Sequence, residues 1–240
     1  MEQISEDKFG RLINDSSRVS LNWEAYMWLF LPIFYIKNAI DTRLIRLLVN
    51  WNFRQIGRKL RGFNNLSYSN EFIRISKETI KNETYDYYKE VENCLKRNKN
   101  DCIKGKKYID GLMDLHFTTT NAKYLLLFLE TCENTDVHIV PLEYSVEHIY
   151  PKKDKGELKN RLLLNNIGNL TLYEKKNSEN NHLGNFSLGA KPYSKKKEQY
   201  LKSNSKITRE TSLKFDTFKE KEIIPRCLYL SELLNEHTDY

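Results

Sequence analysis

The sequence predicts an α+β protein, with a mainly helical N-terminal region followed by a smaller mixed region and a C-terminal helix. Apolar residues recur at helical spacing over much of residues 1–135. After Asn134 the pattern changes to short apolar runs, which Pro141 and Gly168 interrupt. The chain has 240 residues, 40% of them hydrophobic, which is enough for a substantial core. We therefore expect a helical region over 1–135 and a second domain over 136–240.

Three segments of the N-terminal region have the spacing of amphipathic or buried helices. They run from Asp41 to Leu60, from Glu71 to Leu95 and from Asn121 to Glu133, with Asn121 as a helix-start residue. A cluster of helix-breaking residues, 62–69 (GFNNLSYS), separates the first two. This region is therefore predicted to be a set of packed helices.

Residues 25–36 (AYMWLFLPIFYI) form the most apolar run of the chain. With 12 residues and an internal Pro32, the run is too short to span a bilayer. It is expected to be a buried helix or, as the alternative, a docking surface for a partner protein. No secretory signal opens the chain, and the four cysteines lack C-x-x-C spacing. These features favour a reduced, cytoplasmic protein with neither a membrane segment nor a structural zinc.

The second region is predicted to contain short strands. Residues 137–140 and 144–149 have extended character, and a charged loop follows at 152–159. The apolar run 162–172 suits a turn beside a strand. Residues 215–234 are expected to close the chain as a helix.

The positive charge of the chain is concentrated in one segment. The formal net charge is +7, and residues 151–206 hold 13 Lys and Arg against 5 Asp and Glu. Such runs commonly form a solvated face, but this one surrounds a Glu-His motif and so favours a surface for a polyanion. The candidate contacts to nucleic acid are Lys152, Lys153, Lys191, Lys195, Lys196 and Lys197.

That motif lies within residues 145–151 (SVEHIYP). Hydrolysis of a phosphodiester needs a base for water, neutralisation of the phosphate charge and stabilisation of the leaving oxygen. A neutral His148 can supply the base. A divalent ion held by a carboxylate and an amide oxygen can supply the rest, and such hard ligands suit Mg²⁺ or Mn²⁺. Asn169, in the block 166–172 (NIGNLTL), can orient the imidazole or brace the loop that carries it.

A Glu-His pair alone is more often plain strand structure, so the order and spacing of the blocks carry the argument. From about Phe117 to Leu234 the chain resembles the HNH-type nuclease domain in the C-terminal half of GmrSD-type modification-dependent restriction proteins and their relatives in phage defence. The matching blocks are 124–130 (YLLLFLE), 146–151 (VEHIYP), 166–172 (NIGNLTL) and 196–203 (KKEQYLKS). The resemblance implies a ββα-metal fold, a single divalent ion and phosphodiester cleavage. It assigns the general base to His148, the positioning role to Asn169 and a metal-binding carboxylate to Glu147.

The family also places a metal-binding Asn on the helix after the second strand, and here the sequence departs from the pattern. Asn180, in residues 180–185 (NNHLGN), is the first choice and requires a small insertion before it. Asn185 is the alternative and requires a longer one.

The expected function is that of a metal-dependent endonuclease in restriction or antiviral defence, with DNA favoured over RNA. Cleavage of an RNA such as tRNA is one alternative, and a non-catalytic nucleic-acid-binding subunit is the other. The chain has no Gly-rich phosphate-binding loop of the Walker type. A nucleotide-dependent sensor is therefore expected on a separate protein.

Overall fold

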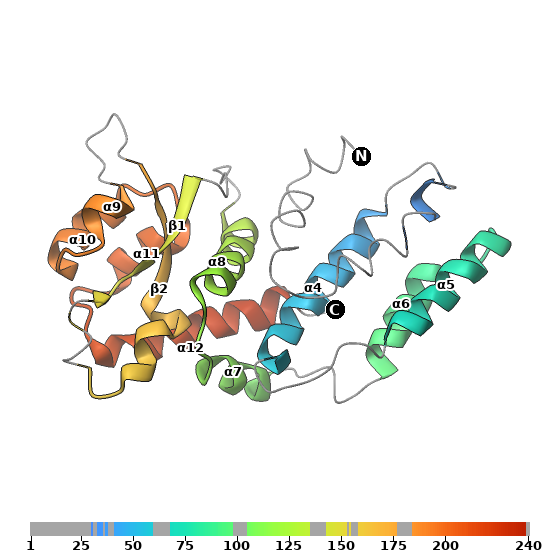
Figure 1. Ribbon diagram of the computed structural model, residues 1–240, viewed down its shortest axis with the longest axis horizontal. Helices are drawn as coiled ribbons and strands as arrows, with labels where there is room; N and C mark the ends of the chain where they lie inside the picture. Colours follow the sequence, from blue (N-terminus) through green and yellow to red (C-terminus); the bar gives the residue numbers. More distant parts are fainter. Residues whose placement is uncertain are drawn as a thin grey trace. The chain divides into compact units, whose positions relative to one another are not determined.

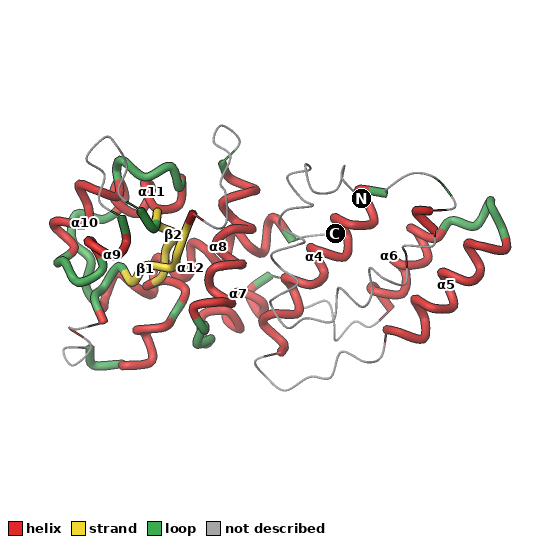
Figure 2. Tube along the Cα trace, turned by 45° about the horizontal axis from the view of Figure 1, so that its top comes forward, coloured by secondary structure: helices red, strands yellow, loops and turns green. Residues whose placement is uncertain are grey.

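The computed structural model describes residues 30, 33–35, 37, 41–59, 68–97, 105–134, 143–152, 154, 158–176 and 184–238. The chain divides into two compact units, residues 1–108 with 238–240, and residues 109–237. The described part is α+β, as predicted: it is mostly helical and contains one two-stranded sheet (Figures 1 and 2). No helix in the described ranges combines the length and the apolar character that a membrane span requires.

The described part of the first unit consists mainly of helices. They are α4 (Thr42–Lys59), α5 (Ser69–Lys81), α6 (Tyr87–Arg97) and the start of α7 (Lys106–Met113). Helix α4 buries Leu44, Leu47, Leu48 and Trp51, which share one face, and it packs against α6. The predicted helix at 41–60 is thus confirmed.

The predicted helix from Glu71 to Leu95 is in fact two helices, α5 and α6. The side-chain oxygen of Asn82 accepts hydrogen bonds from the backbone N–H of Thr84 at 3.0 Å and from its hydroxyl at 2.8 Å. This local turn competes with the helix, which is a common property of Asn. Helical periodicity alone does not detect such a break.

Two predicted segments lie partly or wholly outside the described residues. Of the apolar run 25–36, Phe30, Ile33 and Phe34 are described and buried. The expected extended segment 137–140 lies outside the described residues.

The second unit surrounds a small antiparallel sheet. Its elements are the end of α7, α8 (Thr119–Glu133), β1 (Tyr144–His148), the 3₁₀ turns η4 (Arg161–Asn165) and η5 (Ile167–Asn169), β2 (Leu170–Glu174), α9 (Asn185–Leu188), α10 (Tyr193–Tyr200), α11 (Lys206–Lys214) and α12 (Glu220–His237). In the register Tyr144 pairs with Glu174, and His148 pairs with Leu170. Helix α8 contacts both strands and α11 contacts β2, so the sheet lies inside the core.

Helix α8 belongs to this second unit, so the boundary lies at residue 109, whereas the sequence analysis placed it after residue 135. Helix α8 begins at Thr119, with Thr118 rather than Asn121 as its N-cap; the Thr118 hydroxyl accepts from the backbone N–H of Asn121 at 3.2 Å. Near its end the buried Glu130 carboxylate accepts the backbone N–H of Lys206 at 2.5 Å and of Ile207 at 3.1 Å. An acidic group of α8 thereby caps α11, where the helix dipole favours negative charge.

Candidate active site

The predicted Glu-His pair stands at the end of β1, inside the second unit. Glu147 is 4% exposed and His148 is 8% exposed. Both border a pocket of roughly 280 Å³, which Val146, Lys152, Gly189 and Ala190 complete. The pocket therefore joins a carboxylate, an imidazole and one exposed cation.

His148 is held as a neutral imidazole. Its Nε2 atom lies 3.1 Å from Oδ1 of Asn165, and an amide oxygen can only accept, so Nε2 carries the proton and Nδ1 is the basic nitrogen. Burial lowers the pKa of His148 to about 4; Lys152 and Lys196 act in the same direction, and the Asn165 contact opposes them. At neutral pH the ring is therefore uncharged, with Nδ1 unprotonated.

Asn165 was not singled out by the sequence analysis. It ends the turn η4, four residues before Asn169, and its partner His148 is 17 positions earlier in the chain. The only sequence signal is the repeated Asn in residues 165–169 (NNIGN), which also suits an ordinary turn.

Asn169 braces the segment that follows His148. Its Oδ1 accepts from the backbone N–H of Tyr150 at 2.8 Å, while its Nδ2 donates to the carbonyl oxygens of Leu164 at 2.9 Å and Tyr150 at 3.4 Å. The backbone oxygen of Asn169 also accepts from the N–H of Ile149 at 2.9 Å. Of the two roles considered for Asn169, these contacts correspond to bracing the loop.

Helix α12 holds the turn that carries Asn169. The buried guanidinium of Arg226 donates from Nη1 to the carbonyl oxygens of Ile167 at 3.1 Å, Gly168 at 3.0 Å and Leu170 at 2.7 Å. A Cβ atom on Gly168 would lie 2.1 Å from the backbone oxygen of Ile223. Only glycine fits this close approach between the turn and α12.

Lys196 is not a nucleic-acid contact, contrary to the expectation from the basic run. Its side chain is fully buried, and Nζ donates to Oε1 of Glu147 at 2.5 Å and to the carbonyl oxygen of His148 at 2.6 Å. Burial raises the pKa of the Glu147 carboxyl, and the charge and hydrogen bond of Lys196 oppose that rise. Lys196 is thus internal to the site and out of reach of a phosphate in solution.

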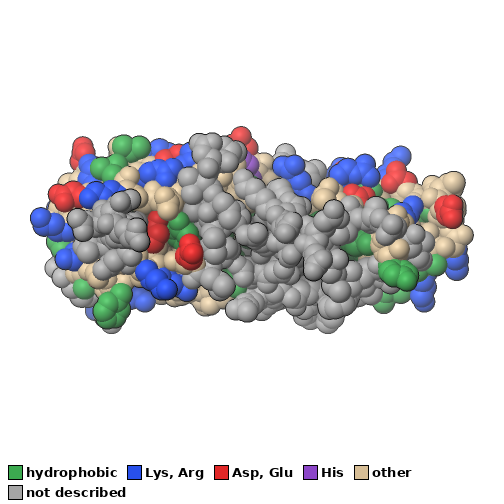
Figure 3. All heavy atoms as spheres, turned by 90° about the horizontal axis from the view of Figure 1, so that it is seen from above, with side chains coloured by type: hydrophobic (Ala, Val, Ile, Leu, Met, Phe, Trp, Pro, Cys, Tyr) green, Lys and Arg blue, Asp and Glu red, His purple; other side chains and the backbone are tan. Residues whose placement is uncertain are grey.

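The other predicted lysines differ in their placement. Lys152, Lys191 and Lys195 are exposed, while Lys197 is partly exposed and forms an ion pair with Asp216 at 2.7 Å. Lys153 lies outside the described residues. Among the described residues on the face shown in Figure 3, Lys and Arg side chains are interspersed with Asp and Glu.

Of the two Asn candidates for the metal, only Asn185 is described; Asn180 lies outside the described residues. Asn185 begins α9, and its Nδ2 donates to Oγ of Ser145 at 2.7 Å and to the carbonyl oxygen of Val146 at 3.3 Å. A Cβ atom on Gly189 would lie 3.4 Å from Oε2 of Glu147 and 3.7 Å from Oδ1 of Asn185. The two oxygens therefore border the same space beside Gly189.

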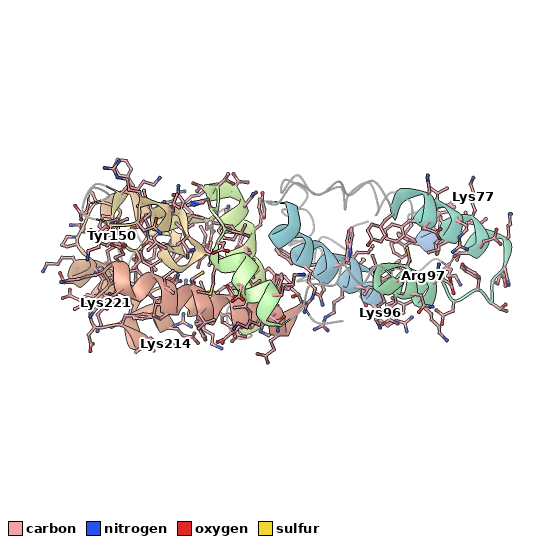
Figure 4. All side chains as sticks on the ribbon, turned by 90° about the horizontal axis from the view of Figure 1, so that it is seen from below. Lys77, Lys96, Arg97, Tyr150, Lys214 and Lys221 are labelled. Carbon is pink, nitrogen blue, oxygen red and sulfur yellow. The ribbon has the colours of Figure 1, made fainter. Side chains whose placement is uncertain are left out.

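A larger pocket, of roughly 480 Å³, includes neither Glu147 nor His148. Tyr150, labelled in Figure 4, lines it, together with aromatic rings and acidic side chains. The acidic residues at its wall are Asp154, Asp216 and Glu220. The described residues that line this pocket include neither the Glu-His pair nor another imidazole, so the smaller pocket is the better candidate for phosphodiester chemistry.

Comparison with known families decides the affiliation of the chain. The family described as GmrSD restriction endonucleases, C-terminal domain, matches residues 56–233, which is more than half of the chain. The chain belongs to this GmrSD family. It is therefore a nuclease domain of a restriction system, as the resemblance predicted. The match to the GmrSD domain begins well before Phe117, where the recognised motifs start. No curated protein matches the sequence.

Proposed function

We propose that this chain is an HNH-type endonuclease with a ββα-metal core that cleaves DNA with the help of one divalent ion. The order of elements supports the proposal, since the antiparallel strands β1 and β2 are followed by helix α9. His148 ends the first strand, and Asn185 begins the helix. Restriction endonucleases act on DNA, which favours DNA as the substrate.

The observation that carries the proposal is that Glu147 Oε2 and Asn185 Oδ1 both lie near Gly189, 3.4 Å and 3.7 Å from the position of a Cβ atom there. A carboxylate and an amide oxygen fit Mg²⁺ or Mn²⁺, which bind few protein ligands and retain water. Within the described ranges no group of three His, Cys, Asp or Glu side chains could hold a metal, so a thiolate or imidazole site is not favoured there. A bound ion would neutralise phosphate charge and stabilise the leaving oxygen.

The protein's own residues then perform the proton transfer. The Nδ1 atom of neutral His148 removes a proton from the attacking water, while Asn165 holds Nε2. Asn169 fixes the backbone of Tyr150 and so keeps the end of β1 in place. Lys152, exposed at the pocket, is positioned to attract a backbone phosphate.

We propose Asn185 rather than Asn180 as the amide ligand, because Asn185 borders the same space as Glu147. The test compares Asn185→Ala with Asn180→Ala in Mn²⁺ binding, measured by calorimetry. Loss of binding in Asn185→Ala alone is expected, whereas loss in Asn180→Ala alone would assign the ligand to Asn180.

The nuclease activity is tested with supercoiled plasmid and total tRNA, each incubated with Mg²⁺, Mn²⁺ or EDTA. Wild type is expected to cut the plasmid only with a metal ion, and His148→Ala is expected to bind DNA but not cut it. Cleavage of tRNA alone would change the substrate class. Wild type that binds DNA and never cuts with any divalent ion would identify a binding module.

A further inference from the structure

The positively charged side chain of Lys196 is buried in the interior, next to the Glu-His pair of the candidate active site. It lies on α10, its side chain has no solvent exposure, and its ammonium contacts both Glu147 and the backbone of His148. Burying an ammonium group costs several kcal/mol unless it is well paired. Lys196 on α10 therefore contacts two consecutive residues of β1, Glu147 and His148.

The ammonium occupies only one of the two oxygens of Glu147. Oε1 accepts from Nζ at 2.5 Å, whereas Oε2 borders the space beside Gly189 that Oδ1 of Asn185 also borders. One oxygen is thus bound to Lys196, and the other lies beside Gly189, which lines the pocket.

We propose that Lys196 is a positioning residue that limits Glu147 to ligation through a single oxygen and thereby selects Mg²⁺ or Mn²⁺ over Ca²⁺. The inference rests on the proposed metal-dependent function. Mg²⁺ and Mn²⁺ sites are compact, whereas Ca²⁺ takes more oxygens and often binds a carboxylate through both of them. A lysine held on Oε1 prevents the two-oxygen mode that Ca²⁺ favours.

The test is a comparison of Lys196→Met with Lys195→Met. Lys195 is the adjacent residue of α10 and is exposed, so its substitution removes the same charge without touching Glu147. The dissociation constants of Mn²⁺ and Ca²⁺ are measured by calorimetry without nucleic acid. The Ca²⁺ dissociation constant divided by the Mn²⁺ dissociation constant should fall by about tenfold or more in Lys196→Met, which corresponds to about 1.4 kcal/mol. The same ratio should stay unchanged in Lys195→Met.

The outcomes separate the inference from the proposed function. Suppose that wild type binds Mn²⁺ and that Lys196→Met keeps the wild-type ratio of the two dissociation constants, whether or not both affinities fall. Lys196 then serves only as a structural countercharge, and the inference fails. If wild type binds neither ion, both the metal site and the inference fail.

A second measurement needs no variant, in case Lys196→Met does not fold. A buried ammonium with two hydrogen bonds exchanges its protons slowly, so its ¹⁵N–H signal should be visible in NMR spectra of wild type. The signal, assigned through the side-chain carbons, should persist in saturating Mg²⁺. Its disappearance on addition of Mg²⁺ would show that the ion displaces the lysine from Oε1 and would overturn the inference.

Discussion

The Nε2 atom of His148 lies 3.1 Å from the Oδ1 atom of Asn165, which links the end of β1 to the turn η4. An imidazole with one nitrogen bound in this way has a defined tautomer, and its other nitrogen is free to act as a base. The orientation of the proposed base therefore depends on a residue outside the Glu-His motif.

Replacing Asn165 should slow cleavage without weakening substrate binding. The contact is one hydrogen bond worth about 0.5–1.5 kcal/mol, so Asn165→Ala should lower the single-turnover rate roughly 2- to 12-fold. Asn165→Asp keeps an acceptor at the same place and should retain most of the rate. Equal loss in both variants would contradict a role through the acceptor oxygen.

Stability should depend on pH through His148. The pKa of His148 is about 4 in the folded protein and near 6.5 in an unfolded chain. Between these values the unfolded state binds the additional proton, so the stabilisation present above pH 6.5 is lost as the pH falls toward 4. Urea unfolding in EDTA should show this loss with a slope of up to about 1.4 kcal/mol per pH unit, and His148→Gln should have a smaller slope. An unchanged slope would contradict the neutral, buried imidazole.

Local patterns identified some parts of this site and missed others for physical reasons. Strand character and the adjacent Glu147 and His148 are local features, so the sequence was sufficient to find them. Lys196 looked like part of a basic surface run, yet it shares one buried helix face with Tyr193 and Tyr200, at spacings of three and four residues. That face was recognisable, but a charge on it contradicts the usual pattern, and its partners, which include Glu147 and the backbone of His148, are distant in the sequence.

Gly168 should tolerate no side chain. In Gly168→Ala the added methyl group would meet the backbone of α12, which cannot move like a side chain, and we expect a loss of about 1–3 kcal/mol in unfolding free energy. Gly111→Ala is the matched control, because a Cβ atom there meets nothing within 4 Å and alanine favours the helix α7. Urea denaturation compares the two. A Gly168→Ala protein as stable as wild type would contradict the close approach.

Lys152 should contribute to nucleic-acid binding through charge. Lys152→Ala is expected to weaken DNA binding uniformly across sequences and to reduce the slope of log affinity against log salt by about one. Lys221→Ala is the control, since Lys221 is an exposed lysine on α12 and does not line the pocket (Figure 4). Fluorescence anisotropy over a salt series measures both. A similar change in the two variants would mean that only total charge matters.

The partners of the site are widely separated along the chain, and this affects how the enzyme can be made. Lys196, which neutralises Glu147, follows it by 49 positions, and Arg226, which holds the turn bearing Asn169, lies in the last helix. A nascent chain that has not yet released α10 and α12 from the ribosome carries the Glu-His pair without the contacts that bury and brace it. We therefore expect the site to be complete only after α10 and α12 have left the ribosome and packed against the sheet and the turn.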